Sequence, residues 1–207
     1  AATTADVLVE YADGPLFGGQ AGYNRQVSNW IAGIEADVSG TGIRAFHAQP
    51  PFCPLNPLGC APAGPQFSAG SFLKQDVAWL ASLRGRLGHA WGAGMVYVTG
   101  GAALAGIDYQ ANLTDGVGVG PAFPVKISKT RSGWVAGGGY EWPVWSNWTL
   151  RGEYLYYRLE DFSATATAFS VSGATGCRGD NAAHCSATYR WNDLDIHSLR
   201  LGLNYRL

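Results

Sequence analysis

Apolar and polar residues alternate most regularly at the end of the chain. Leu199, Leu201, Leu203 and Tyr205 share one face, and the residues between them are arginine, asparagine or glycine. Six further segments repeat this period of two, at 16–27, 30–42, 76–91, 94–109, 129–142 and 148–160. Because successive side chains of a β-strand point to opposite faces, the pattern predicts seven strands, each with one apolar face.

The connections between these segments alternate in length. Residues 26–29, 92–94 and 143–147 form short turns, whereas 43–75, 110–128 and 161–194 are long and rich in small and turn-forming residues. In an antiparallel meander, all short turns then lie at one end and all long loops at the other, as in barrels with periplasmic turns and extracellular loops. The sequence therefore predicts one all-β domain, 1–207, with the three long segments as extracellular loops.

A single-chain barrel of this kind closes with an even number of strands, so an eighth strand is needed. Ala5–Tyr11 is the remaining stretch with strand character, and Asp13–Pro15 would form the first loop. A spanning helix is the alternative for the uncharged segment Ala90–Ile107, but its five glycines disfavour a helix. We expect an eight-stranded antiparallel up-and-down transmembrane β-barrel.

Tryptophans gather near the strand ends. Those at the short turns are Trp30, Trp91, Trp142, Trp145 and Trp148, and those near the loop ends are Trp79 and Trp134. Trp79 and Trp91 share a face twelve residues apart, which at ~3.3 Å per residue and ~40° tilt spans roughly 30 Å, the thickness of a bilayer core. This spacing predicts two aromatic girdles around a lipid-facing band.

Charged residues fall on the face opposite the girdle tryptophans. An arginine facing lipid near the midplane would cost ~2–4 kcal/mol, which favours an inward position. The predicted lumenal layer consists of Glu35, Asp37, Arg84, Arg86, Arg151, Glu153 and Arg200. Eight strands enclose an interior that side chains can fill, so we expect these charges to interlock and plug the barrel. An ion-selective ring and an acid/base pair of Glu35 with Asp37 are the alternatives.

The composition excludes several classes of function. Charged residues make up 14% of the chain and its net charge is −1, with lysine only at Lys74, Lys126 and Lys129. Such a chain is poorly suited to binding nucleic acid, so no nucleic-acid partner is expected. The single methionine, Met95, and the small residues at the start are typical of a mature exported chain after removal of a signal peptide.

The four cysteines form two close pairs, Cys53 with Cys60 and Cys177 with Cys185. An even number in an exported chain indicates disulfides, for which three connectivities exist and local pairing within each loop is favoured. Reduced thiols remain the alternative. The spacing within each pair does not match a zinc site, so we expect no metal and no other cofactor.

The remaining candidate residues lie mostly in loops. His47, His89, His184 and His197 are scattered, and loop histidines could capture haem. The tripeptide Arg178–Asp180 lies between two cysteines and could contact a host receptor, although a match of this length is weak. No arrangement of residues indicates catalysis, so no enzymatic activity is expected.

Several motifs together resemble the small porin-like outer-membrane proteins of alphaproteobacteria, in the OmpA-like eight-stranded barrel superfamily. The motifs are Gly18–Asn24, Asn29–Asp37, Leu83–Gly88, Tyr97–Ala103, Gly133–Trp134, Gly137–Glu141 and Trp148 with Glu153–Tyr156. The end, Leu201–Leu207, is similar to the family's barrel-assembly signal, with leucine in place of the usual final phenylalanine. The N-terminus departs from the family, which usually opens with an aromatic and glycine-rich first strand.

The resemblance implies an abundant structural protein of the bacterial outer membrane. Its expected partners are outer-membrane lipid and lipopolysaccharide, the barrel-assembly machinery during insertion, and host or envelope molecules at the loops. We expect a barrel with a charge-plugged lumen that supports envelope integrity and presents disulfide-stapled loops. A narrow diffusion porin and a loop-mediated haem or receptor binder are the alternatives.

Overall fold

The computed structural model describes residues 2–7, 13–48, 72–112, 125–169 and 184–206, and they form strands and short connections. The strands are β1 (Ala2–Val7), β2 (Leu16–Val27), β3 (Trp30–Ala48), β4 (Phe72–Trp91), β5 (Gly94–Asn112), β6 (Val125–Trp145), β7 (Trp148–Leu159), β8 (Phe162–Phe169), β9 (His184–Trp191) and β10 (Leu194–Tyr205). No helix with the length and apolarity of a membrane span is found in the described ranges.

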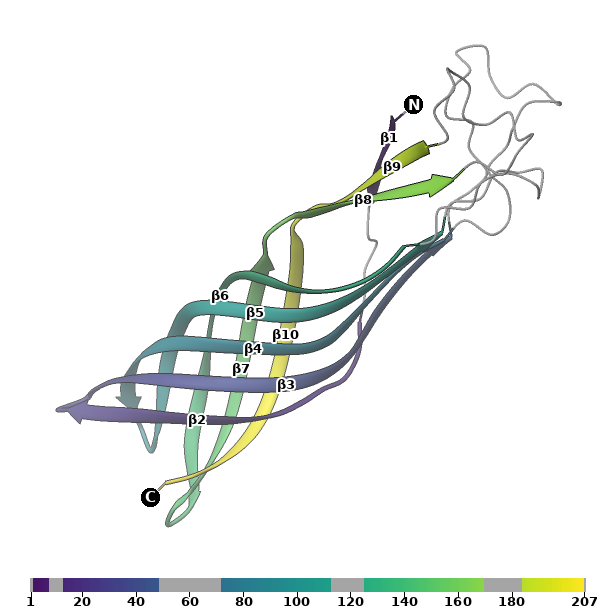
Figure 1. The fold of residues 1–207 in the computed structure, drawn as a ribbon. Helices are drawn as coiled ribbons and strands as arrows, with labels where there is room; N and C mark the ends of the chain where they lie inside the picture. The colour runs from purple at the N-terminus through teal and green to yellow at the C-terminus, as the bar shows by residue number, and fades with distance from the viewer. Residues whose placement is uncertain (1, 8–12, 49–71, 113–124, 170–183, 207) are drawn as a thin grey trace.

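Seven strands form one antiparallel sheet in the order β10-β7-β6-β5-β4-β3-β2. Figure 1 shows this sheet strongly curled, with β1, β8 and β9 beyond one end and the C-terminus at the other. The predicted short turns are confirmed, since two residues join β2 to β3, β4 to β5 and β6 to β7. Ser28 and Gly92 begin two of these turns with φ of 54° and 63°, a conformation that glycine adopts without strain. The all-β, up-and-down prediction is therefore confirmed.

The predicted N-terminal strand was placed wrongly. β1 pairs in parallel with β9, and together with β8 these strands form a separate three-stranded sheet. Asp13 is bridged to Arg44, and the backbone N–H of Gly42 donates to the carbonyl of Pro15 at 2.9 Å. These bonds extend the line of β2 along β3, so Asp13–Pro15 make no hairpin. The chain therefore enters β2 from the loop end, and among the described residues before β2 no strand joins the seven-stranded sheet.

The strands also run further toward the loops than the sequence pattern indicates. β3 reaches Ala48 rather than residue 42, β4 begins at Phe72, and β5 continues to Asn112. β6 begins at Val125, and β8 and β9 lie within the segment predicted as the loop 161–194. The extracellular position assigned to these segments stays a prediction.

The physical reason is that the inward and outward faces exchange polarity between the two ends of β3 to β7 and β10. We call residues 16–40, 81–102, 136–154 and 198–205 the turn half, and residues 41–48, 72–80, 103–112, 125–135, 155–159 and 194–197 the loop half. In the turn half of β4, Leu83 is exposed and Arg84 is buried, whereas in its loop half Lys74 is partly exposed and Val77 is buried. Register shifts between Gly40 and Ile43 and between Val77 and Trp79 lie near the border. A rule that follows one apolar face therefore ends β3, β4, β5 and β6 too early on their loop side.

The loop half has an apolar interior. Its largest buried apolar side chains, with Trp191 of β9 against them, are Ile43, Leu73, Val77, Leu80, Ile107, Tyr109, Val135, Leu155, Tyr157, Leu159 and Ile196. Trp191 packs at 4.8 Å from the ring of Tyr109 and stacks on Phe162 at 5.4 Å. The base of the β8–β9 hairpin is thus packed onto the interior of the curled sheet.

Arg131 of β6 holds this base in place. Its guanidinium donates to the carbonyl oxygens of Glu160 at 2.6 Å and Asn192 at 2.9 Å, and to the hydroxyl of Tyr109 at 3.1 Å. Glu160 follows β7 and Asn192 precedes β10, so one buried arginine joins both strands at the point where the hairpin leaves the sheet.

We expect Arg131→Met to lower the free energy of unfolding by about 2–4 kcal/mol, because it removes several donors and leaves largely buried acceptors unpaired. The measurement is urea unfolding in detergent micelles followed by tryptophan fluorescence. Lys126→Met, at an exposed position of the same strand, is the matched control. Equal unfolding midpoints for the two variants would contradict the role of Arg131.

Candidate functional site

The candidate site is a set of ionisable side chains buried on the concave face of the turn half. Five strands contribute them, and alternation along each strand turns all of them inward. We call this set the ionic cluster; its members are Glu35 and Asp37 of β3, Arg84 and Arg86 of β4, Glu141 of β6, Arg151 and Glu153 of β7, and Arg200 of β10. It contains four carboxylates and four guanidinium groups, so its formal charges balance.

Arg84 lies at the centre of the ionic cluster and is 1% exposed. Its Nη2 contacts Glu35 and lies 3.2 Å from Asp37, while its Nη1 lies 3.1 Å from Glu153. Glu35 and Asp37 belong to the neighbouring strand, but Glu153 belongs to β7 on the other side of the interior. One arginine thus connects three carboxylates from two strands.

The other arginines complete the arrangement. Arg151 donates to Glu35 at 2.5 Å and lies 3.5 Å from Glu153. Arg86 donates to Glu141 at 2.6 Å, and Arg200 donates to Asp37 at 2.8 Å. Each carboxylate of the ionic cluster therefore contacts at least one guanidinium group.

Several of these contacts cross the interior instead of following the sheet. Arg200 lies opposite Glu153 in the β10–β7 register, yet it pairs with Asp37 on β3. Arg86 and Glu141 are on β4 and β6, with β5 between them. Only a sheet curled around its own concave face brings these groups within hydrogen-bond distance.

Hydroxyl groups satisfy part of the remaining hydrogen-bonding capacity. Tyr97 donates to Glu153 at 2.9 Å and Thr149 donates to Glu141 at 2.6 Å, while Ser82 donates to Asp37. The guanidinium of Arg86 also lies 3.7 Å from the centre of the Tyr97 ring, a cation–π contact. Gly139 leaves room for this ring, since a Cβ there would come within 2.6 Å of the Tyr97 hydroxyl. A protein interior accommodates charged side chains only when they are paired and hydrogen-bonded in this way.

The structure brings together all seven residues predicted for the lumenal layer and adds members that the sequence analysis missed. Glu141 is the main addition, because it balances the predicted excess of one arginine. It is adjacent to Trp142 and therefore on the face opposite that girdle tryptophan, so the argument that selected the other charges would also have selected Glu141. Tyr97 gave no comparable signal, since a tyrosine suits a girdle as well as an interior.

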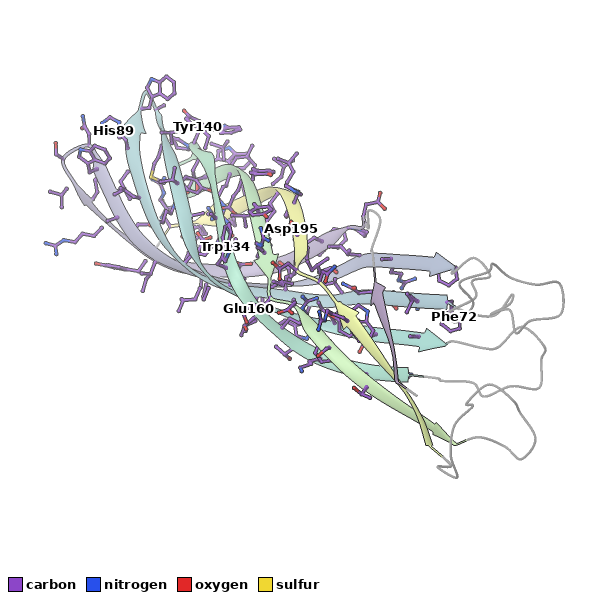
Figure 2. The ribbon with its side chains drawn as sticks, turned by 90° about the horizontal axis from the view of Figure 1, so that it is seen from above. Phe72, His89, Trp134, Tyr140, Glu160 and Asp195 are labelled. Carbon is purple, nitrogen blue, oxygen red and sulfur yellow. The ribbon has the colours of Figure 1, made fainter. Side chains whose placement is uncertain are left out.

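The predicted girdle residues lie on the convex face at two levels. Trp30, Trp91, Trp142 and Trp148 are partly or well exposed near the turns, where Trp30 contacts His89 and Trp148 contacts Tyr205, each with ring centres 5.1 Å apart. Trp134 is 47% exposed and packs against Tyr156 at 5.3 Å, and Trp79 lies over Gly106. Figure 2 places Trp134, Asp195 and Glu160 between the turn end at His89 and Tyr140 and the loop end at Phe72.

Other predicted residues cannot be placed. Cys53, Cys60 and Cys177 lie outside the described residues, as does Arg178–Asp180, and of Cys185 in β9 only the backbone is described. The side chains of His47 and His184 are likewise not described. The disulfide and loop-binding predictions therefore stay predictions. Within the described ranges, no group of three or more His, Cys, Asp or Glu side chains has the arrangement of a metal site.

Comparison with known proteins gives a consistent result. The family model described as "Outer membrane protein beta-barrel domain" matches residues 2–206. Two relatives, each named "31 kDa outer-membrane immunogenic protein", from Brucella melitensis and Brucella suis, are 31% identical over 94% of this chain and 67% of their own length. A "22 kDa outer membrane protein" of Rhizobium leguminosarum is 27% identical over 74% of this chain and 59% of its own length. No solved structure gives a significant match.

We expect Arg84→Met to lower the free energy of unfolding by about 3–5 kcal/mol, because it leaves buried carboxylates without their shared partner. Arg25→Met, at an exposed position of β2, should change it by less than about 0.5 kcal/mol. Urea titrations of both variants in the same micelles measure the difference. If Arg84→Met were as stable as Arg25→Met, the ionic cluster would have no structural role.

Proposed function

Because this chain belongs to the family of outer-membrane protein β-barrel domains, and is therefore an outer-membrane protein, we propose that it serves as a structural barrel with a closed lumen. The observation that carries the proposal is the charge-balanced ionic cluster across the interior, in which every charged side chain contacts one of opposite charge. A conducting pore needs a water-filled path, and the mutual contacts of these buried side chains argue against one.

A second barrier supports the same function. On the loop side of the ionic cluster, Leu80 and Leu155 are 0% exposed within the apolar interior of the loop half. An ion that passed the charged layer would next meet packed aliphatic and aromatic side chains that cannot hydrate it. The two layers lie in series, and either one is sufficient to block ions. This arrangement favours a closed barrel over a narrow diffusion porin.

The convex face supports a lipid environment for the turn half. Large apolar side chains are exposed there, among them Phe17, Ile34, Val38, Leu83, Val98, Leu199, Leu201 and Leu203. Beyond Trp79 and Trp134 most outward positions are polar, with Lys74, Asp76, Asp108 and Arg158, although Phe46 is also exposed there. The apolar belt is the surface proposed to contact lipid, and the polar positions above it suit the headgroups of lipopolysaccharide.

The loop end is the proposed interaction surface. With the turns on the periplasmic side, the long connections and β1, β8 and β9 project from the cell. The Brucella relatives are named immunogenic proteins, which fits surface-exposed loops in those proteins. For this chain we propose support of the envelope by the barrel and contacts with external molecules by the loops, and insertion through the assembly machinery by way of β10.

Planar-bilayer recordings test the closed lumen. We expect the purified wild-type protein to show no steady single-channel steps at neutral pH. Replacing the charged layer (E35A/R84A/R151A/E153A) or the apolar layer (L80S/L155S) alone should leave the bilayer silent, because the other layer still blocks ions. The combined variant, with folding verified by circular dichroism, should conduct. Steady steps from the wild-type protein would overturn the proposal.

The lipid-facing belt has a separate test. Leu83→Arg places a charge on the convex face of the turn half and should destabilise the protein in lipid vesicles by about 2–4 kcal/mol. Thr130→Arg, on the convex face of the loop half, should cost no more than about 1 kcal/mol. Comparable losses at the two positions would show that the membrane does not end between them.

A further inference from the structure

A group of aromatic and ionisable side chains lies on the convex face of β6, β7 and β10, where the turn half meets the loop half. We call it the border patch; its members are Trp134 of β6, Tyr154, Tyr156 and Arg158 of β7, and Asp195 and His197 of β10. Trp134, Arg158 and Asp195 form one row across the three strands, and Figure 2 labels both ends of this row. Tyr156 and His197 lie opposite each other in the next row toward the turns.

The rings of the border patch contact one another. The ring centres of Trp134 and Tyr156 are 5.3 Å apart, and those of Tyr156 and His197 are 5.1 Å apart. The hydroxyl of Tyr154 lies 2.6 Å from Nδ1 of His197, so a hydrogen bond holds the imidazole beside the tyrosines. Trp134 and Tyr154 are each 47% exposed. The patch therefore presents an ordered aromatic surface to the outside of the sheet.

Polar groups on the loop side of these rings are oriented by their own hydrogen bonds. Tyr156 donates to Asp195 at 2.9 Å, and Arg158 donates to Asp193 at 2.9 Å. The side chains of Arg158, Asp193 and Asp195 are 47%, 43% and 48% exposed, so their remaining donors and acceptors are open to a ligand. Two carboxylates beside one guanidinium give this end of the patch a net negative charge, which disfavours binding of a phosphate.

The outward face of β10 changes from apolar to polar at the border patch. Leu199, Leu201 and Leu203 lie on its turn side, and Leu199 and Leu201 are 85% and 82% exposed. His197 lies about 6.8 Å along the strand from Leu199, and Asp195 lies as far again from His197. A ligand along β10 would contact the leucines with one end and the polar groups with the other. The surface therefore suits an amphiphile.

The chemistry of the polar end matches an uncharged hexose. The faces of a pyranose ring carry C–H groups, which are attracted to the electron-rich face of an aromatic ring. Its hydroxyl groups both donate and accept hydrogen bonds, so they can pair with carboxylates and with a guanidinium at the same site. Aromatic rings beside donors and acceptors, with no excess of positive charge, favour a sugar over a phosphate.

The other loop-side girdle tryptophan has different neighbours. Trp79 lies opposite Gly40 on β3 and Gly106 on β5, whereas the row of Trp134 continues with Arg158 and Asp195. The indole of Trp79 covers Gly106. A girdle position by itself therefore does not require the polar groups of the border patch.

We propose that the border patch binds the sugar of a glycolipid of the outer leaflet, an uncharged hexose joined to acyl chains. The acyl chains lie along Leu199 and Leu201, and the hexose stacks on Trp134 and hydrogen-bonds to Asp195 and Arg158. The inference rests on the proposed lipid contact of the turn half, and it adds a site that selects one class of lipid from the surrounding membrane.

Native mass spectrometry of the protein in detergent micelles tests the site, with synthetic glucosyl diacylglycerol as the probe. We expect one glucosyl lipid to bind per protein molecule, and phosphatidylglycerol with the same acyl chains to bind at least about tenfold more weakly. Soluble methyl glucoside lacks the acyl chains, so it should compete only at a concentration at least about a hundredfold higher.

Two variants and two matched controls locate the site. Trp134→Ala removes the stacking ring and Asp195→Ala removes an acceptor, so each should weaken binding of the glucosyl lipid by about tenfold. The controls are Trp79→Ala, at the other loop-side tryptophan, and Asp108→Ala, at a partly exposed outward position of β5. Each control should change the affinity by less than about twofold. Circular dichroism verifies that all four variants fold.

Three results would overturn the proposal. Phosphatidylglycerol could bind as tightly as the glucosyl lipid, Trp79→Ala could weaken binding as much as Trp134→Ala, or methyl glucoside could compete at the concentration of the lipid. Failure of the proposed lipid contact is a separate result, because the wild-type protein would then not insert into phosphatidylcholine vesicles that contain no glycolipid. A protein that inserts but shows no preference for the glucosyl lipid contradicts the border-patch site alone.

Discussion

The pairing of Arg84 with carboxylates from both sides of the concave face is the interaction on which the turn half depends. Lipid excludes charge from the convex face, so alternation sends the charged side chains of these strands inward, apart from Arg25 near the turn end of β2. Once inward, a charge must find a partner within the small interior, because an unpaired buried ion costs far more than a pair contributes. The curl of the sheet and the balance of four acids against four arginines satisfy the same condition.

The arrangement of the loop half suits contact with water rather than with lipid. Its outward positions carry polar groups such as Lys74 and Asp108, and its interior holds Ile107, Tyr109 and Leu159. This is the arrangement of a water-soluble β-protein, continuous with a membrane-type half along the same strands. The border lies just below Trp79 and Trp134, where aromatic rings suit the interface between hydrocarbon and water. A single sheet thus suits lipid in its turn half and water in its loop half, because its outward face changes from apolar to polar between the two halves.

This exchange has a consequence for the interior. Charged and apolar layers stack along one axis, and Arg131 fastens the upper layer to the hairpin of β8 and β9. The ionic cluster crosses the concave face from β3 to β7 and β10, so its contacts also hold the curl of the sheet.

Local alternation was sufficient to determine the strand class, the short turns and the inward position of Glu35, Arg86 and Glu153, since side-chain direction in a strand follows from its period of two. The same rule would have found Glu141. The rule placed the loop-side ends of β3, β4, β5 and β6 too early, near residues 42, 76, 109 and 129. Alternation alone does not reveal that the apolar face, which is outward in the turn half, becomes the inward face in the loop half. The pairing of Arg200 with Asp37 rather than with Glu153, and of β1 with β9 rather than within the main sheet, depended on the curvature of the sheet. These contacts join residues far apart in the chain, and only the tertiary structure decides which distant groups come within reach.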